Sequence, residues 1–366
     1  MLLRTVQRLC AGSVSRLGTW RSCCMVAPAR MFQYVCVQSP GRQDGSYNRS
    51  GRAPGIVVSA AAFSLFSKLV EDKDEGLTPE EENIIYHLKK SKFSIMKGEM
   101  EEAEEILHKT LHLAHKCQSK RAIIYTYDLM ANLAFLRGEY NNAEKLFKTT
   151  LVYMINEGVK QDDNSFIEIS LKMASIYAAL DKNDLAVAGF QFCILSLEEK
   201  IEKEKDLPED LLTAEERTNT HLLLGLCLDS YARYLVANSQ LIHAQTLYEK
   251  ALRICREEQG ELHPQTVNLL SDLATVLEAQ GRFDEAYTYV KQALDLAQKT
   301  DHPNYHVILG NMATILLHQE NLVDAERIFK EALTKAEEKK DPGSIYHIQE
   351  GLSELTRRKT AQEQNL

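Results

Sequence analysis

One pattern recurs six times along the chain, and it constrains the fold more than any other feature of the sequence. In each copy, apolar residues at helical spacing precede a turn, and an alanine with a large apolar residue four positions later follows the turn. The alanines are Ala103, Ala143, Ala186, Ala244, Ala286 and Ala325. A recurring unit of this size predicts an array of small helical units and not one globular core.

Each copy predicts two short helices joined by a turn, because its apolar positions fall on two helical stripes. The turn position holds Gly98, Gly138, Asp181, Ser239, Gly281 and Glu320 in the six copies, so three of the turns lack a glycine. Alanine lets the second helix approach the first, and the large apolar residue fills the groove between them. Neither helix can bury its face alone, so stacked neighbours must supply the missing wall. The expected fold is an all-α superhelical solenoid of six helix pairs.

These copies resemble tetratricopeptide repeats over residues 78–339. Their anchoring alanines are 40, 43, 58, 42 and 39 residues apart, and they resemble the long repeats of kinesin light chains, most of all from Leu262 to Ala286. The first helix is expected to begin with Thr78 as N-cap and Pro79 in its first turn. A capping helix is expected over residues 343–358, with a disordered tail at 359–366.

Charge divides the chain into a basic leader and an acidic body. Residues 1–70 hold eight arginines and Lys68 against the single acid Asp44, giving +8, so the rest carries −17 of the total of −9. Residues 1–52 are rich in Arg and Ser, as in a mitochondrial presequence, and a disordered basic tail is the alternative. The acidic body lacks the clustered Lys and Arg that phosphate binding needs, so nucleic acid is not an expected partner.

Residues 53–70 form a marginal membrane segment. Residues 53–67 carry no charge, and as a helix they would span ~22 Å, or ~27 Å with the extension to Val70, against a hydrocarbon core of ~30 Å. A membrane span and an interfacial or buried segment are both open readings. If the segment spans the inner membrane, the basic leader stays in the matrix and the body faces the intermembrane space.

The interval between Ala186 and Ala244 is about 16 residues longer than its neighbours. The extra residues fall at 198–217 and would lengthen two helices into a hairpin, with Thr213 and Glu216 as the capping box of the returning helix. A solvated loop and a partner-binding tip are the two readings of this insertion. The residues expected at the tip are Leu207, Pro208, Leu211 and Leu212.

The sequence holds no motif for phosphate, dinucleotide or zinc-hydrolase chemistry and no nucleophile elbow. The four cysteines of the body form no C-x-x-C pair, so we expect them to fill helix interfaces. His108, His112 and His115 share a helix face, but without a neighbouring cysteine they favour solvated or packed histidines over a metal site. We therefore expect no cofactor, metal or small-molecule substrate; an unrecognised hydrolase would need a closed polar pocket.

The resemblance implies peptide binding on the concave surface that the first helix of each pair forms. The groove-facing positions carried over copy by copy are Lys92, Asp128, Asn132, Asp229, Arg233 and Thr275. The clamp that some members use for terminal carboxylates needs lysines in a fixed register. Leu88 and Asp128 occupy that position in the first two copies, which disfavours such a clamp.

As a whole, the chain resembles the mitochondrial tetratricopeptide repeat proteins that serve respiratory complex III. The resemblance implies a non-enzymatic inner-membrane adaptor that binds complex III subunits, including the Rieske protein, and supports assembly or maintenance of the complex, with clearance of Rieske fragments. It also implies import by the mitochondrial machinery and cleavage by a rhomboid protease, for which the small residues Ser59, Ala60, Ala61 and Ala62 are suited. The alternative is a cytosolic adaptor of the kinesin-light-chain or cytokinesis-scaffold type.

Overall fold

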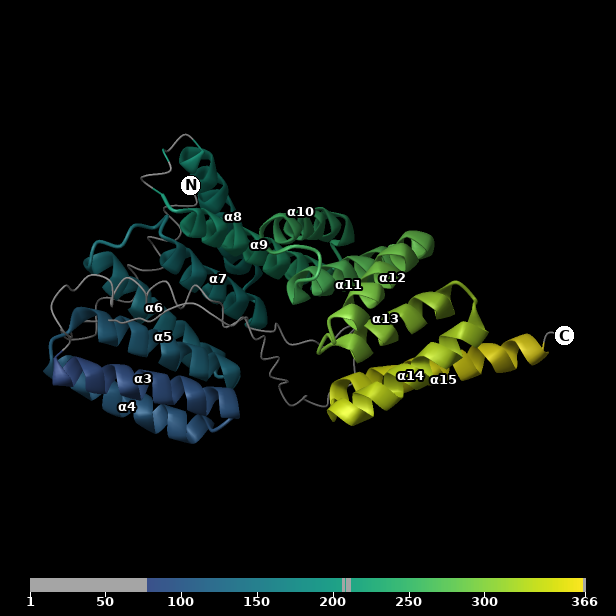
Figure 1. The fold of residues 1–366 in the computed structure, drawn as a ribbon, viewed down its shortest axis with the longest axis horizontal. Helices are drawn as coiled ribbons and strands as arrows, with labels where there is room; N and C mark the ends of the chain where they lie inside the picture. The colour runs from purple at the N-terminus through teal and green to yellow at the C-terminus, as the bar shows by residue number, and fades with distance from the viewer. Residues whose placement is uncertain (1–77, 206–207, 209–211, 365–366) are drawn as a thin grey trace. The chain divides into compact units, whose positions relative to one another are not determined.

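The computed structural model describes residues 78–205, 208 and 212–364. The expected presequence at 1–52, the segment at 53–70 and the tip residues Leu207 and Leu211 lie outside the described residues. Throughout the described ranges, every regular element is an α-helix (Figure 1). The predicted all-α repeat fold is therefore confirmed. The chain divides into two compact units, one ending at Leu223 and the other beginning at Leu224.

Unit 1, the described residues up to Leu223, consists of three helix pairs and the first part of α9. Its helices are α3 (Pro79–Lys97), α4 (Met100–Lys116), α5 (Lys120–Leu136), α6 (Tyr140–Asn156), α7 (Asn164–Ala179) and α8 (Asn183–Glu204), followed by α9 (Ala214–Ala237). Within each pair the two helices pack together, and α4 and α6 also pack against the first helix of the next pair. This is the stacking that the repeats require, because each helix buries two faces.

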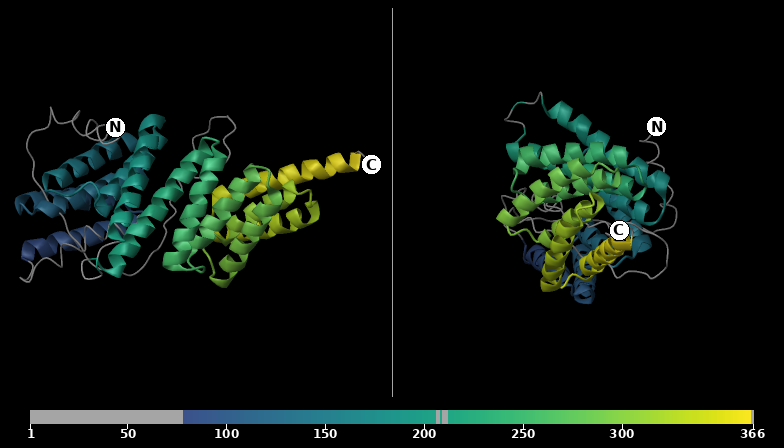
Figure 2. Two further views of the ribbon diagram at one scale, coloured as in Figure 1. Left: turned by 90° about the horizontal axis from the view of Figure 1, so that it is seen from above. Right: turned by 90° about the vertical axis from the view of Figure 1, so that its right-hand side faces the viewer.

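Unit 2 begins inside α9 and continues the same pairing. Its helices are α10 (Leu241–Gln259), α11 (Pro264–Ala279), α12 (Phe283–Lys299), α13 (Tyr305–His318), α14 (Leu322–Lys339) and α15 (Pro342–Gln364). Both views in Figure 2 show α14 and α15 side by side, and α15 packs on α13 as well. The last helix therefore covers the face that a seventh pair would otherwise cover.

The alanines and the turns explain why these residues form pairs. All six anchoring alanines are fully buried, and so are Leu107, Phe147 and Val290 four positions after three of them. The six turn residues, with or without glycine, all have a positive φ, from 55° at Asp181 to 81° at Gly98. A residue in the left-handed conformation ends the first helix of each pair and reverses the chain toward the second. The turn therefore lies at the same position of each repeat, even where the residue is not glycine.

The helix ends follow local rules at two predicted places. At the start of α3, the Thr78 hydroxyl accepts the Glu81 N–H and the Glu81 carboxylate accepts the Thr78 N–H, with Pro79 in the first turn. The same capping box joins Thr213 and Glu216 before α9. With 22 and 24 residues, α8 and α9 are longer than the other repeat helices, so the extra residues of the insertion are divided between them.

The prediction for the C-terminus is wrong in one respect. Residues 359–366 are expected to form a disordered tail, but α15 continues through Gln364. The Arg358 guanidinium donates to the Leu317 carbonyl oxygen at 3.1 Å, and the Lys359 ammonium pairs with Glu326 of α14. These contacts with other helices hold the last turns, and a sequence window around residue 359 does not show them.

In the described part of the chain, none of the helices is both long enough and apolar enough to cross a bilayer.

Candidate functional site

The first helices of unit 1 bring together a group of charged side chains that we call the Asp128 cluster. It consists of Lys92 on α3, Asp128 and Asn132 on α5, and Glu168 and Lys172 on α7. The Lys172 ammonium lies 3.3 Å from the Asp128 carboxylate and 3.1 Å from the Glu168 carboxylate. Asp128, Glu168 and Lys172 are all buried. Buried carboxylates persist only when they are paired, so Lys172 is the residue that makes this arrangement possible.

Lys92 is the least buried member of the Asp128 cluster. Its ammonium lies 4.9 Å from the centre of the Tyr125 ring. Burial lowers the pKa of Lys92 to about 8, against the opposing effect of the Asp128 carboxylate. Burial also raises the pKa of the Tyr125 hydroxyl well above its ordinary value. Lys92 is therefore a cation that loses its charge close to physiological pH.

Asn132 fixes the Asp128 carboxylate. Its amide nitrogen donates to the Asp128 main-chain oxygen at 2.7 Å and to the Asp128 carboxylate at 3.0 Å. Its side-chain oxygen is buried and has no hydrogen-bond partner. Because an unsatisfied buried acceptor costs free energy, a donor N–H from a bound chain would be stabilising at this place.

Unit 2 carries a second group on its first helices, which we call the Asp229 cluster: Asp229 and Arg233 on α9 with Gln265 and Asp272 on α11. The Arg233 guanidinium donates two hydrogen bonds to the buried Asp229 carboxylate, at 2.9 and 2.7 Å. Gln265 donates to the same carboxylate at 3.3 Å, and Asp272 lies 3.5 Å from Arg233. Burial alone would lower the pKa of Arg233, but Asp229 and Asp272 outweigh it and raise the pKa well above its ordinary value.

Hydrogen bonds between polar side chains also join α11 to α13 and to Asn304, the residue that precedes α13. The Asn304 amide donates to the Asn268 side-chain oxygen at 3.3 Å, and the Asn311 amide donates to the Ser271 hydroxyl at 2.9 Å. Thr275, expected to face the groove, donates its hydroxyl to the Ser271 main-chain oxygen of its own helix. Its hydroxyl is therefore satisfied within α11.

The predicted groove residues occupy two fixed positions relative to the turn that follows each first helix. Lys92, Asn132, Arg233 and Thr275 each lie six residues before the turn residue of their copy, and Asp128 and Asp229 lie ten before it. The sequence prediction omits Glu168, Lys172, Gln265 and Asp272. A usable signal is that Lys172 and Asp272 both lie nine residues before their turns, so they meet the preceding first helix.

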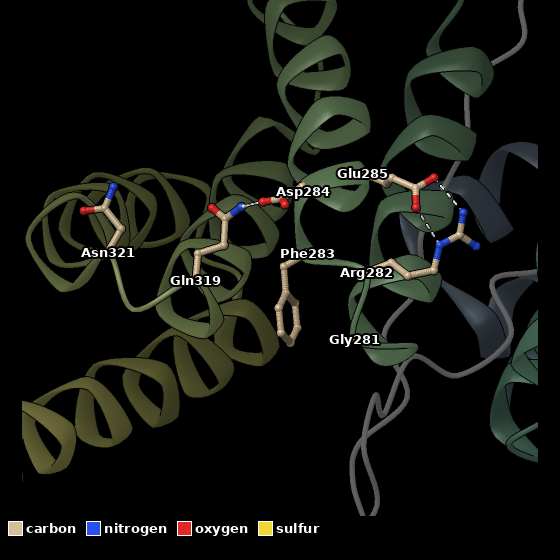
Figure 3. A pocket seen from close by; sticks show the side chains of 7 residues that line it. All are labelled: Gly281, Arg282, Phe283, Asp284, Glu285, Gln319 and Asn321. Carbon is tan, nitrogen blue, oxygen red and sulfur yellow. Dashed lines mark hydrogen bonds and ion pairs between the residues drawn. The ribbon is translucent and has the colours of Figure 1, made fainter.

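A polar hollow of about 610 Å³ lies at the turns of unit 2. Figure 3 shows that it is lined by the turn after α11 and the turn after α13. Arg282 forms two hydrogen bonds with the Glu285 carboxylate, and Gln319 donates to Asp284 at 2.9 Å. These bonds satisfy the polar groups locally and join one turn to the next, so the hollow is part of the repeat scaffold.

The histidines and cysteines that the sequence analysis singled out do not come together in one site of the described structure. Within the described ranges, no group of three His, Cys, Asp or Glu side chains is placed to hold a metal ion. The His108 ring lies 4.0 Å from the Glu104 carboxylate on the same helix. Cys193, Cys227 and Cys255 are buried, as expected of small apolar residues. Cys117 departs from this expectation, because it is only half-buried at the C-cap of α4.

Two comparisons place the sequence among known proteins. The sequence profile of the tetratricopeptide repeat family matches residues 226–299 and 267–338. The chain is 53% identical to the mitochondrial tetratricopeptide repeat protein 19 of Homo sapiens, over 84% of each chain. It is 50% identical to the protein of the same name from Rattus norvegicus, over 98% of this chain and 95% of that one.

Solved structures support the fold. The apo form of RapI superimposes with a TM-score of 0.55 at 15% identity, covering 80% of each chain. A signal-transduction ATPase with a tetratricopeptide repeat sensor from Pyrococcus horikoshii superimposes with a TM-score of 0.54 at 14% identity, covering 71% of this chain and 37% of that one. At these identities the likeness extends to the helical repeat architecture alone.

Proposed function

The chain belongs to the mitochondrial tetratricopeptide repeat protein 19 family, and from this we propose that it is a non-enzymatic adaptor of the mitochondrial inner membrane that binds respiratory complex III. In this role it supports assembly or maintenance of the complex and helps to clear fragments of the Rieske iron–sulfur protein. Identity of about half over nearly the whole chain supports the assignment to mitochondria. The Asp128 and Asp229 clusters on the first helices support a role in protein binding.

The observation that carries the binding role is the repetition of one arrangement in both units. In each, a buried aspartate holds a partner side chain four residues later on the same helix, Asn132 in unit 1 and Arg233 in unit 2. Side chains fixed in this way lose little entropy when a peptide binds, so they are suited to recognition. Lys92 and the guanidinium of Arg233 would pair with carboxylates of the bound protein, and Asn132 would accept a main-chain N–H.

The proposed topology uses the leader. Import would proceed through the mitochondrial machinery, residues 53–70 would associate with the inner membrane, and a rhomboid protease would cleave within Ser59–Ala62. The acidic body would then face the intermembrane space, because the basic leader favours the matrix side. Protease treatment of mitoplasts tests this: the body should be digested once the outer membrane is opened, and a protected body would contradict the topology.

A second contact with the partner is proposed at the hairpin between α8 and α9. Pro208 is exposed beyond the two lengthened helices, and the apolar Leu207, Leu211 and Leu212 surround it in sequence. Deletion of residues 207–212 should abolish binding of complex III while leaving the thermal midpoint of unfolding unchanged. Retained binding would show that the insertion is a solvated loop.

Affinity purification from mitochondria tests the main proposal. The full chain should retain complex III subunits, including the Rieske protein, and a double variant with Lys92→Gln and Arg233→Gln should lose them. The matched control changes two exposed cations outside the clusters, Lys89→Gln and Arg327→Gln, and should retain the complex. If the unaltered chain retains no complex III, the proposed partner is wrong. If the unaltered chain is found outside mitochondria, the cytosolic adaptor becomes the better reading.

A further inference from the structure

The outer face of α3 carries large exposed apolar side chains between lysines, which is unusual for the first helix of a stacked array. Tyr86 is 63% exposed, Phe93 56% and Met96 60%. The opposite face of α3 packs against α4 and α5. A terminal helix of a repeat protein normally presents a polar face to water, so three large apolar side chains on one side indicate a surface that something covers.

The equivalent positions in later repeats show what covers such a face. Tyr86 and Phe93 lie twelve and five residues before the turn residue Gly98. In α5, α7, α11 and α13 the residues at the same two positions are at most 3% exposed: Thr126, Leu133, Ile169, Ile176, Leu269, Val276, Ile308 and Ile315. Each of these four helices is packed by the second helix of the preceding pair, namely α4, α6, α10 and α12. The face of α3 is therefore shaped for a preceding second helix.

The sequence just before α3 contains the register of a second helix. In every described pair, the anchoring alanine is followed by a large apolar residue four positions later and by Leu or Ile eight positions later. Ala62 and Phe66 repeat the first two positions, and Val70, which is apolar but neither Leu nor Ile, occupies the third. The distance from the alanine to the next first helix is 17 residues at Lys120 and Pro342, 19 to 21 in three other repeats and 28 across the insertion. Pro79 lies 17 residues after Ala62, which is within this range.

We propose that residues 62–75 of this chain dock as a second helix on the outer face of α3 and cover Tyr86 and Phe93. A helix of this length spans about 21 Å, which is also the distance along α3 from Pro79 to Phe93. Docked in the antiparallel direction of the other pairs, it places Phe66 and Val70 against the apolar side of α3. The array then begins with a covered helix, as do the pairs that start with α5, α7, α11 and α13.

This docking goes beyond the proposed function and does not depend on it. The docked residues begin at Ala62, so they stay with the body if cleavage occurs within Ser59–Ala62. They also form the end of the proposed membrane segment, which means that the bilayer and α3 compete for Phe66 and Val70. The alternatives to this occupant are a second copy of the chain and a lipid surface.

Site-directed cross-linking in the full chain tests the docking. Cys10, Cys23, Cys24, Cys36 and Cys117 are changed to Ser, and a short bismaleimide is offered to a Phe66→Cys, Tyr86→Cys pair. The matched control pair joins Phe66→Cys to Glu105→Cys, an exposed position on α4 in the same unit and at a more similar separation in sequence. A cross-link within one chain should form at least about tenfold faster in the first pair, because docking raises the effective concentration of the two thiols. Equal rates, or cross-links between two chains, would overturn the proposal.

Accessibility gives an independent measurement. In the same background, Phe93→Cys should be labelled slowly by a maleimide, Phe66→Asp should raise the rate about tenfold, equivalent to about 1.4 kcal/mol of docking, and Phe66→Leu should leave it slow. An unchanged rate with Phe66→Asp, or protection only when lipid vesicles are added, would overturn the docking. Mapping of the N-terminus and flotation with membranes report on the proposed function separately, so the two can fail independently.

Discussion

The two polar clusters occupy the same register in different units, but they balance their buried aspartates with different cations. Asp128 is paired with Lys172 and lies near Lys92, so the balancing charges in unit 1 are ammonium groups. Asp229 accepts hydrogen bonds from the planar guanidinium of Arg233, which is partly exposed. The Gln265 amide donates to the same carboxylate. Lysine can release its proton and arginine cannot. One repeat frame therefore carries a charge network that responds to pH in unit 1 and a fixed one in unit 2.

The largest expected effect follows from breaking the buried pair of unit 1. Lys172→Met leaves the Asp128 and Glu168 carboxylates buried without their ion pair, which should cost about 3–5 kcal/mol. Hydrogen exchange of α5–α8 measures this loss locally, while exchange in α11–α14 reports on unit 2. The control is Lys109→Met, which removes an exposed ion pair with Glu105 and should cost about 0–1 kcal/mol. A loss of less than about 1 kcal/mol for Lys172→Met would mean that the cluster rearranges or is hydrated.

The corresponding change in unit 2 should cost less. Arg233→Met removes two hydrogen bonds to Asp229, but the Gln265 amide still donates to that carboxylate. We expect a loss of about 1–3 kcal/mol in the exchange of α11–α14. Arg233→Lys should recover little of it, because an ammonium cannot form the two parallel bonds. If Arg233→Met costs more than Lys172→Met, the contrast between the two clusters is reversed.

How far the sequence could predict these clusters depends on the distance between partners. The pairs Asp128–Asn132 and Asp229–Arg233 lie within one helix turn, and the resemblance to known repeats places all four residues in the groove. Lys172 and Asp272 come from the next repeat. Their shared position nine residues before the turn can be read from the sequence, but the folded stack is needed to show that this position meets the preceding first helix. The exposure of Tyr86, Phe93 and Met96 on α3 could not be predicted either, because an apolar residue at helical spacing is normally expected to be buried.

Acidification should destabilise unit 2, through its loops and not through the Asp229 cluster. His263 and His302 each accept a main-chain N–H two residues later through Nδ1, and burial lowers the pKa of both rings. The folded state favours the neutral rings, so the unfolded state binds more protons as pH falls through 6.5. The free energy of unfolding of unit 2 should therefore fall below that pH.

Hydrogen exchange at pH values from 7.5 to 5.5, corrected for intrinsic rates, measures this loss. His302→Asn can still accept the N–H of Asn304 but does not titrate, so it should reduce the slope. A slope that His302→Asn leaves unchanged would assign the acid sensitivity to other groups.

At alkaline pH the free energy of unfolding of unit 1 should depend on pH, because Lys92 loses its proton in that range. Its pKa is lowered by burial from 10.5 to about 8, so between these values the unfolded state binds more protons than the folded state. The free energy of unfolding of unit 1 should rise with pH over this window. Lys92→Met should remove the rise, measured by urea unfolding followed at unit 1 between pH 7.5 and 9.5. Lys89→Met, on the exposed face of the same helix, is the control, and a slope shared by both variants would exclude Lys92 as its source.

The smallest effect should be the one that the two units share. Asp181 in unit 1 and Ser239 in unit 2 occupy left-handed turns with φ of 55° and 60°, a conformation that costs a residue with a Cβ about 1 kcal/mol. Asp181→Gly and Ser239→Gly should each raise the local free energy of unfolding by about 0.5 kcal/mol, since part of the gain is lost to the greater freedom of glycine in the unfolded chain. Gly138→Ala should do the reverse. Equal responses of the two units here, beside unequal responses at Lys172 and Arg233, would locate the difference between the units in the first-helix clusters and not in the repeat frame. A stabilisation confined to one unit would instead mean that the frame itself differs.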